Sequence, residues 1–388
     1  MPVVNRVAAM QEEVAAWRQD LHAHPELGFD VHRTAGIVAE KLKAFGCDEV
    51  IPGVGKTGVV GIIRGRKDTS GRVMGLRADM DALPIQEATG VPYTSKTPGK
   101  MHACGHDGHT SMLLGAAKYL CETRNFDGTV CVIFQPNEEG LTGGEAMLAD
   151  GLVDRFGIQE LYGMHIWPGA AVGSFGIRAG PLLAAADRFT IEIKGKGAHA
   201  MAPHTSVDPV VVAAHTITAL QTIASRSVDP LESVVVSTCM VRAGDAFNII
   251  PETAMLAGTV RTLNERVRDI VETRLKAIVE STATAFGAKA SVRYERFVPV
   301  TVNDAAKTQL AVRVAREVAG TANVRDDVSP SMGAEDFAHM LNVRPGAYIL
   351  VGNGASSGLH TPGFNFNDAA LPFGISYLAR LAETGMPT

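Results

Sequence analysis

A ten-residue segment of the chain concentrates side chains that bind metal ions. Residues 101–110 hold one thiol, three imidazoles and a carboxylate, in a sequence with only five cysteines and twelve histidines. Thiolate and imidazole are the ligand types that zinc and similar transition metals select. The glycines of the segment let the backbone bend, so that Cys104 and His106 can face one centre. The segment therefore predicts a metal site.

Further candidate ligands lie far apart in the sequence. Glu138 and Glu139 follow one apolar run, His165 follows another, and His360 lies near the C-terminus. Structural zinc usually takes a closed set of four cysteines and histidines, whereas catalytic zinc mixes ligand types and keeps a position open. The dispersed, mixed set therefore predicts a catalytic, hydrolytic metal site. For a lone histidine, a purely structural role is the alternative.

The adjacent carboxylates of Glu138 and Glu139 repel each other, so a turn that holds both needs a compensating charge, which metal ions supply. Because neighbouring side chains point in different directions, Glu139 can bind metal while Glu138 acts as general base towards the attacking water. The alternative is an exposed acidic turn. Cys104 has the alternative of a small buried hydrophobic residue, but its polar and glycine neighbours favour a reactive thiolate.

Predicted strands and helices alternate around these residues. An apolar stripe that includes Val14 and Leu21 predicts an N-terminal helix. The next predicted helices span 34–45, 109–120 and 145–148, and the predicted strands span 59–64, 73–77, 129–134 and 161–164. This order predicts an α/β fold with a mixed, largely parallel sheet sandwiched by helices. Asp79, the Glu pair and His165 fall near the carboxyl ends of strands, where such sheets form ligand sites.

A different order begins near residue 187. The predicted strands span 189–194, 234–241, 253–261 and 290–295, and the predicted helices span 207–225 and 265–286. This β-α-β-β-α-β order is that of a ferredoxin-like unit. A helix at 305–318, a strand at 347–351 and a helix at 368–381 then resume the first pattern. We therefore expect a discontinuous catalytic domain at 1–186 and 298–388, with an inserted domain at 187–297.

Composition narrows the class of protein. The hydrophobic content of 46% and the charged content of 20% are typical of a globular protein. A net charge of −5 without basic runs excludes a nucleic-acid or membrane-surface binder. The odd, scattered cysteines argue against a disulfide framework, and no signal-peptide pattern or apolar stretch of membrane-spanning length is evident. We therefore expect a cytoplasmic enzyme.

Seven motifs carry a family resemblance that extends over nearly the whole chain. They are LRADMDALP (76–84), CGHD (104–107), QPNEE (135–139), GKGAHA (195–200), FNIIP (247–251), GTVRT (258–262) and MGAEDF (332–337). In this order they resemble the di-metal amidohydrolases typified by hippurate hydrolase and indole-acetyl-amino-acid hydrolases, which are related to aminoacylase and glutamate-releasing carboxypeptidases. Two positions depart from the wider pattern. Arg77 stands where a ligand histidine is usual, so His106 takes that role, and Asn137 stands where alanine is usual.

The resemblance implies a binding site for two divalent metal ions, zinc or manganese, with cobalt or nickel also compatible. The implied ligands are Cys104, His106, Glu139, His165 and His360. Glu138 is the implied general base. Asp79 and Asp107 are candidates for holding ligand imidazoles in place. The alternative for Asp107 is to cap a helix that begins near His109. We assign no role to His102 or His109.

The inserted domain is implied to act as a lid and as the interface of a homodimer or higher oligomer. His199 resembles the histidine that stabilises the oxyanion, in this family across the dimer. Asn248 and Arg261 resemble substrate-binding residues, and a guanidinium can hold a carboxylate in a bidentate manner. An ordinary surface-strand role is the alternative for Arg261.

The expected reaction is hydrolysis of the amide bond of a small-molecule N-acyl or N-aroyl amino acid. A dipeptidase or carboxypeptidase with the same centre is the alternative within this class. From other classes, Cys104 could be the nucleophile of a cysteine amidase, or the chain could be a silent metal-binding protein. The presence of Glu138, which turnover needs and binding does not, favours an enzyme.

Overall fold

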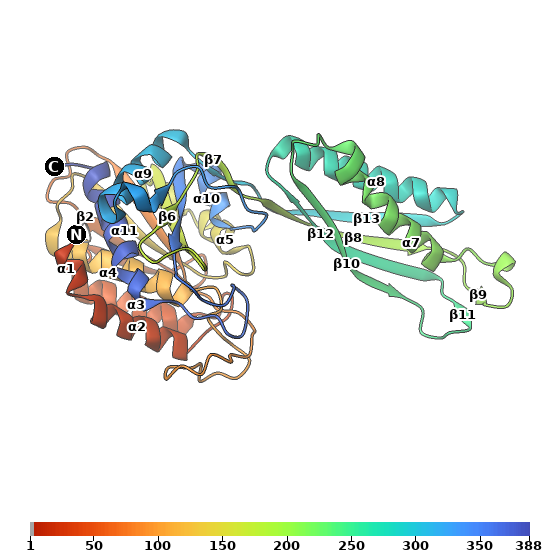
Figure 1. Ribbon diagram of the computed structural model, residues 1–388, viewed down its shortest axis with the longest axis horizontal. Coiled ribbons are helices and arrows are strands. Elements are labelled where there is room, and N and C mark those ends of the chain that lie inside the picture. Colours follow the sequence, from red (N-terminus) through yellow and green to blue (C-terminus); the bar gives the residue numbers. More distant parts are fainter. Residues whose placement is uncertain (1–3) are drawn as a thin grey trace. The chain divides into compact units, whose positions relative to one another are not determined.

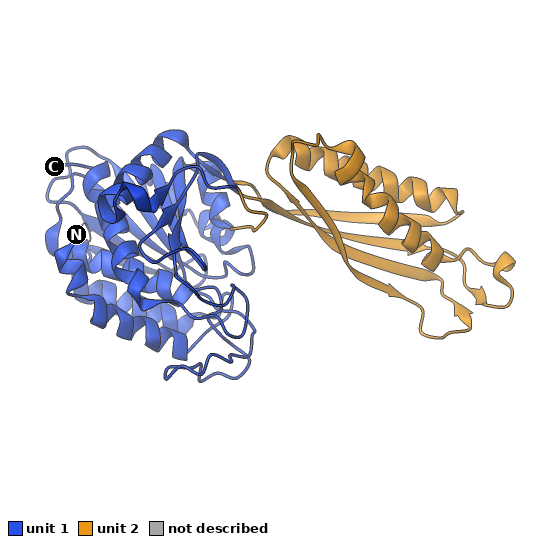
Figure 2. Ribbon diagram, viewed as in Figure 1, with its two compact units in different colours: residues 1–182, 302–329, 336–388 blue, residues 183–301, 330–335 orange. Residues whose placement is uncertain are grey.

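The computed structural model describes residues 4–388, which form two compact units (Figure 2). Unit 1 comprises the described residues up to 182 together with 302–329 and 336–388, and unit 2 comprises 183–301 and 330–335. We expected an insertion at 187–297. The functions of the two parts, as catalytic domain and lid, stay predictions. None of the described helices is both long and apolar enough to cross a bilayer.

Unit 1 is built on an eight-stranded sheet in the order β1-β2-β4-β3-β5-β16-β6-β15 (Figure 1). The strands are β1 (Glu49–Val54), β2 (Gly58–Arg64), β3 (Val73–Asp79), β4 (Thr129–Gln135), β5 (Glu160–Trp167), β6 (Phe175–Gly176), β15 (Val324–Arg325) and β16 (Gly346–Gly352). The central strands β4, β3, β5 and β16 are parallel, while β2 is antiparallel to both of its neighbours. The predicted α/β class, with a mixed and largely parallel sheet, is confirmed.

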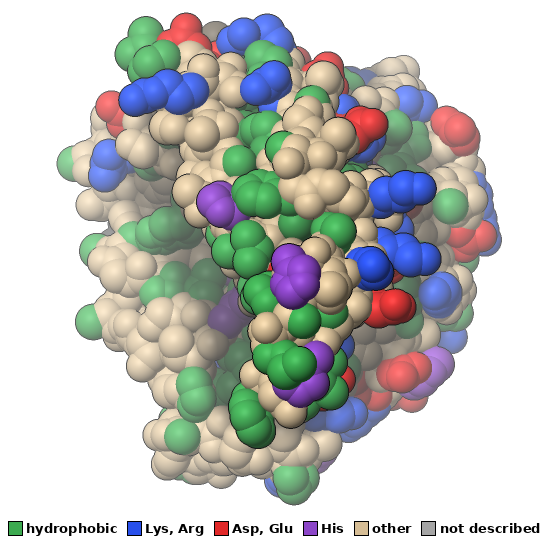
Figure 3. All heavy atoms as spheres, turned by 90° about the vertical axis from the view of Figure 1, so that its right-hand side faces the viewer, with side chains coloured by type: hydrophobic (Ala, Val, Ile, Leu, Met, Phe, Trp, Pro, Cys, Tyr) green, Lys and Arg blue, Asp and Glu red, His purple; other side chains and the backbone are tan. Residues whose placement is uncertain are grey.

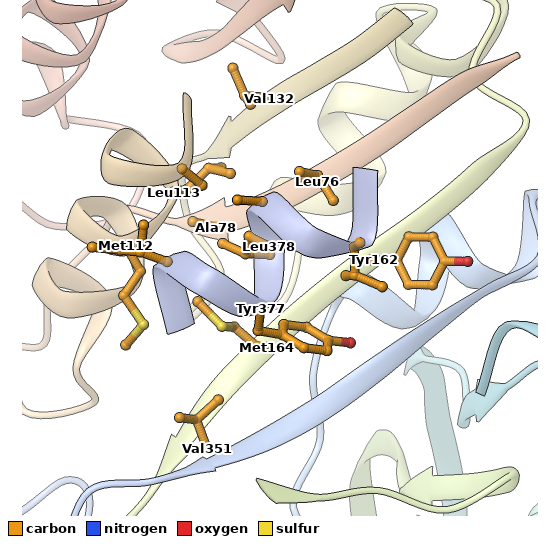
Figure 4. Close-up of a cluster of buried hydrophobic side chains, with 14 of the residues drawn as sticks. Leu76, Ala78, Met112, Leu113, Val132, Tyr162, Met164, Val351, Tyr377 and Leu378 are labelled. Carbon is orange, nitrogen blue, oxygen red and sulfur yellow. The ribbon is translucent and has the colours of Figure 1, made fainter. Parts of the chain in front are cut away.

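Helices cover both faces of this sheet. They are α1 (Asn5–Ala8), α2 (Gln11–Ala23), α3 (His32–Phe45), α4 (His106–Thr123), α5 (Gly143–Ala149), α6 (Leu152–Phe156), α9 (Ala305–Ala319), α10 (Phe337–Val343) and α11 (Leu371–Gly385). On one face, Leu113 of α4 and Leu378 of α11 pack in a core with Leu76 and Ala78 of β3 (Figure 4). Side chains alternate along a strand, so the intervening Arg77 points to the other face, where its guanidinium lies over the ring of Phe337.

The helix that carries the first ligand motif starts earlier than predicted. We expected it to begin near His109, whereas α4 begins at His106. Gly105, with a φ of 89°, is its N-cap residue. The polar, glycine-rich stretch is typical of a loop, which is why the first turn was missed. The predicted N-terminal helix is divided into α1 and α2, and the strand predicted at 161–164 extends to Trp167.

Unit 2 has the predicted ferredoxin-like order. Its elements are β8 (Ala185–Lys194), β9 (Ala198–His199), α7 (Pro209–Leu220), β10 (Val234–Ala243), β11 (Ile249–Ile250), β12 (Thr253–Thr262), α8 (Glu265–Ala285) and β13 (Lys289–Val298). The antiparallel sheet runs β10-β12-β8-β13, and apolar side chains of α7 and α8 pack on it. The short strands β9 and β11 form a separate pair. Where the chain passes between the units, β7 (Gly180–Leu183) pairs with β14 (Thr301–Asn303).

Candidate metal centre

The five predicted ligands come together at one edge of the sheet of unit 1. Glu139 follows β4, His165 lies near the end of β5, and His360 lies in the loop after β16. Cys104 and His106 lie at the start of α4. The Cys104 Sγ is 3.3 Å from the His165 Nε2, and the Glu139 Oε1 is 3.4 Å from the His360 Nε2. Residues from four separate parts of the chain therefore face one another.

The donor atoms form two groups that share Cys104. In one group, the donors of Cys104, His106 and His165 lie within 4.8 Å of one another. In the other, the donors of Cys104, Glu139 and His360 do so. The shared sulfur with two further donors at each position is a ligand set that suits two transition-metal ions with a shared ligand.

Buried donor atoms without partners support this fit. The side chain of His106 is fully buried, and neither of its ring nitrogens has a hydrogen-bond partner among residues 4–388. The Glu139 Oε1 is likewise buried without a hydrogen bond. A buried polar atom left unsatisfied costs about 1–3 kcal/mol. Divalent ions would satisfy one ring nitrogen of His106 and the Glu139 Oε1, so the residues fit the metal pair.

The pKa shifts at the centre follow from burial and from neighbouring charges. Burial, together with the neighbouring His109, lowers the pKa of His165 to about 3, so this imidazole is neutral, as a ligand must be. The adjacent Cys104 thiol and Glu139 carboxylate raise the pKa of His360 to about 10. Metal binding therefore has to displace a proton from His360, because only a neutral imidazole binds metal.

The backbone of the Glu pair is held by a residue that we did not predict. The Glu138 N–H donates to the Asp81 Oδ1 at 2.9 Å, and the Glu139 N–H donates to the Oδ2 at 3.2 Å. The preceding residue, Asn137, has a φ of 55°, a conformation that asparagine tolerates better than most residues. These features fix the turn that carries both glutamates, whose carboxylate oxygens lie 3.9 Å (Glu138) and 3.8 Å (Glu139) from the His106 Nε2.

Asp79 binds a histidine, but not a predicted ligand. Its Oδ1 is 2.7 Å from the His109 Nδ1, whereas the His106 Nδ1 is 3.8 Å away. The His109 Nε2 accepts a hydrogen bond from the Ile166 N–H at 3.0 Å. Both ring nitrogens of His109 are thereby occupied, with the proton on Nδ1. His109 is thus held in the wall of the site. Residues three apart on a helix lie on the same face, so the spacing of His109 from His106 is the sequence signal that could have predicted this position.

Asp107 plays neither of its two predicted roles. It is not a helix cap, because Gly105 occupies that position and Asp107 lies in the first turn of α4. Its Oδ2 accepts a hydrogen bond at 2.8 Å from His22, which is not a predicted ligand, and lies 3.5 Å from the Arg18 Nη1. Asp107 therefore joins α4 to α2.

The predicted residues of unit 2 lie at two places. His199 is exposed in β9, where its Nδ1 accepts a hydrogen bond from the Met201 N–H, and it pairs with Ile249, the neighbour of Asn248. Exposed hydrophobic and histidine side chains gather at this end of unit 2 (Figure 3). Arg261 is half-buried in β12, and its Nε donates to the Thr259 Oγ1 at 3.3 Å.

The donor set defines the class of a metal-dependent hydrolase, and comparison of the sequence with known proteins supports this class. Residues 75–384 match the model of peptidase family M20/M25/M40, and the chain belongs to this family. It is 42% identical to the hippurate hydrolase of Campylobacter jejuni, over 98% of this chain and 99% of that protein. It is 40% identical to the N-acetyl-L-cysteine deacetylase of Bacillus subtilis, over 94% and 86%.

The solved structures agree with the fold. A Bacillus subtilis protein described as a dinuclear metal binding peptidase from the M20 family has a TM-score of 0.86 and 35% identity, with 98% of this chain and 99% of that chain covered. The chain is thus a metal-dependent amidohydrolase with the fold of this family.

Proposed function

We propose that the protein hydrolyses the amide bond of N-acyl or N-aroyl amino acids at a centre of two divalent metal ions. The observation that carries this proposal is the pair of donor groups that share Cys104, with Glu138 beside them. The relatives named as hippurate hydrolase and N-acetyl-L-cysteine deacetylase support substrates in which a carboxylic acid is joined to an amino acid. The alternative remains a dipeptidase or carboxypeptidase.

The proposed ligands are Cys104, His106, Glu139, His165 and His360. Divalent ions bound by them polarise the acyl carbonyl and lower the pKa of water to about 7. The cysteine favours zinc, while the carboxylate suits manganese equally well, and cobalt or nickel are compatible with the histidines. The Asp81 carboxylate accepts hydrogen bonds from the backbone N–H groups of Glu138 and Glu139. We assign metal binding to the side chain of Glu139 and proton transfer to that of Glu138.

Glu138 takes a proton from the attacking water at its carboxylate and later gives it to the nitrogen of the leaving amino acid. The side chain of Glu138 is nearly buried, at 6% exposed, so few other waters compete for it. We assign His199 as the donor to the developing oxyanion, and Asn248 and Arg261 as contacts of the substrate. A homodimer or higher oligomer formed through unit 2, and a cytoplasmic location, also stay proposals.

Chelation followed by metal addition tests the proposal. The purified enzyme is depleted with a chelator, and zinc, manganese, cobalt or nickel is added back while hydrolysis of a panel of N-acyl amino acids and dipeptides is measured. We expect activity to disappear and return, with the highest kcat/KM on an N-acyl or N-aroyl amino acid. Full activity in chelator would instead identify a cysteine-nucleophile amidase, and preference for free dipeptides would identify a dipeptidase.

A further inference from the structure

Two cysteines outside the metal centre face each other in unit 1. Cys47 follows the C-terminal end of α3, and Cys121 lies in the last turns of α4. Their sulfur atoms are 3.6 Å apart, and both side chains are only partly buried. The metal centre uses neither of them. The pair is therefore free for chemistry of its own and open to small reagents.

The backbones that carry these thiols are joined by contacts that do not involve sulfur. Arg124, just after α4, donates from Nη2 to the Gly46 carbonyl at 2.8 Å and from Nη1 to the Asp48 carboxylate at 2.7 Å. Gly46 and Asp48 are the two neighbours of Cys47. The Cys47 N–H also donates to the Leu42 carbonyl, which fixes the end of α3. The two cysteines are thus held opposite each other whatever their oxidation state.

The environment also makes the two thiols unequal. The hydrogen bond from Cys47 lowers the pKa of Cys121, and the guanidinium of Arg124 acts in the same direction. The same hydrogen bond and burial raise the pKa of Cys47. A thiolate, and not a thiol, is the form that reacts with oxidants. Arg124 acts to lower the pKa of both thiols, and we take Cys121 as the sulfur that reacts first.

We propose that Cys47 and Cys121 are a redox-sensitive modification site, which a peroxide converts to a reversible intramolecular disulfide. The Cys121 thiolate attacks one oxygen of hydrogen peroxide, the O–O bond breaks, and the released hydroxide takes a proton to become water. Cys121 is then a sulfenic acid. The Cys47 sulfur attacks it, the S–S bond forms, and the S–O bond breaks as the hydroxyl leaves with the Cys47 proton as a second water. The two sulfurs lose two electrons to the peroxide oxygens.

The geometry makes this closure a local event. A disulfide needs a sulfur separation of about 2.05 Å, and the two sulfur atoms are already within 3.6 Å of each other. The bond would join the ends of α3 and α4 and close a long loop of chain. Closing this loop lowers the conformational entropy of the unfolded state. Transient, redox-dependent disulfides of this kind are the type found in reducing compartments. The inference does not depend on the substrate of the metal centre.

Peptide mapping tests the proposal on the full-length, metal-loaded enzyme. The protein is treated with hydrogen peroxide, free thiols are blocked, and the digest is examined by mass spectrometry without reduction. We expect a linked peptide pair that contains Cys47 and Cys121, lighter by two hydrogen atoms and separated by dithiothreitol. Recovery of both as blocked thiols, in a sample in which the exposed Cys239 is oxidised, would overturn the proposal.

Matched variants separate this pair from the other cysteines. Cys47→Ser should remove the linked peptides and leave Cys121 to oxidise further to the sulfinic acid. Cys131→Ser, at a buried cysteine in β4, should leave the linkage intact. As a second measurement, oxidation should raise the thermal midpoint of the unsubstituted protein and not that of Cys47→Ser. An equal rise in both proteins would also overturn the proposal.

Discussion

Two adjacent glutamates, whose backbones one aspartate fixes, receive different assignments. The Asp81 carboxylate accepts hydrogen bonds from the backbone N–H groups of Glu138 and Glu139. The Glu139 carboxylate lies in the donor group of His360, and the Glu138 carboxylate lies beside this group. The two residues are chemically identical, so the proposed distinction between proton transfer and metal binding rests on which donor groups each carboxylate joins.

Substitution of each glutamate should separate these roles. In Glu138→Gln we expect kcat to fall by about 100- to 10,000-fold with the metal content unchanged, because an amide cannot accept the proton. In Glu139→Gln we expect the metal content itself to fall. Elemental analysis and steady-state kinetics of the two variants provide the measurement. The reverse pattern would mean that the two roles are exchanged.

The sequence predicted which ligands gather, but not what holds them. Three of the five donors, Cys104, His106 and Glu139, lie in motifs that carry the family resemblance. The sheet brings strand ends together, so the meeting of the donors was predictable. His22, the partner of Asp107, lies 85 residues away on another helix, and no local pattern links the two. Asp81 and His109 were missed for a similar reason, because their roles depend on hydrogen bonds that form only in the folded chain.

The buried pair of His22 and Asp107 predicts a pH dependence of stability. Burial disfavours the charged form of His22, but Asp107 and Glu87 raise its pKa from 6.5 to about 9. A raised pKa stabilises the folded state fully below pH 6.5, and this stability is lost as the pH rises to about 9. We therefore expect the free energy of unfolding of the metal-free protein to decrease across this window.

Tryptophan fluorescence during denaturant unfolding can measure this effect, because both tryptophans, Trp17 and Trp167, lie in unit 1. His22→Gln should lose about 3–5 kcal/mol at pH 6 and show a flatter dependence between pH 6.5 and 9. An unchanged slope in this variant would assign the dependence to another group.

At the scale of secondary structure, the start of α4 connects packing to the metal centre. Gly105 lies between the proposed ligands Cys104 and His106, and its φ of 89° is one that residues with a Cβ rarely adopt. A Cβ added there would also lie 2.8 Å from the Ile166 Cγ1 of β5. The helix start is thus tightly packed against the strand that carries His165.

Gly105→Ala should therefore weaken metal binding by about 10- to 100-fold and destabilise unit 1 by about 1–3 kcal/mol. Gly99→Ala is the matched control, because Gly99 also has a positive φ, of 74°, but nothing lies within 4 Å of an added Cβ. Competition with a metal-binding dye provides the measurement. Equal affinities in the two variants would show that the contact with Ile166 is unimportant.

At the scale of the whole molecule, the proposed ligands belong to unit 1 and the proposed oxyanion donor His199 belongs to unit 2. The exposed apolar side chains near His199, among them Met201, Phe247 and Ile249, favour burial of this end of unit 2 against another surface. A second subunit that supplies its His199 would bury them and complete the site.

Complementation tests this arrangement. A chain with His199→Ala and a chain with Glu138→Gln should each be inactive, with the first losing about 100- to 1,000-fold in kcat. If the donor comes from the neighbouring subunit, mixed dimers contain one site with both functional residues. Co-refolding the two variants should then restore activity. Verified mixed dimers without activity would place His199 in its own subunit's site or outside catalysis.

The place of β16 in the sheet has a consequence for how the chain is made. β16 lies between β5 and β6, although Gly346 follows Trp167 by roughly 180 residues. At a synthesis rate of about 5–20 residues per second, the open edge of β5 waits on the order of ten to forty seconds for its neighbour, while unit 2 emerges in an almost continuous stretch. His360 emerges later still, so a newly made chain carries an unpaired strand edge until β16 has left the ribosome, and an incomplete set of proposed ligands until His360 has done so.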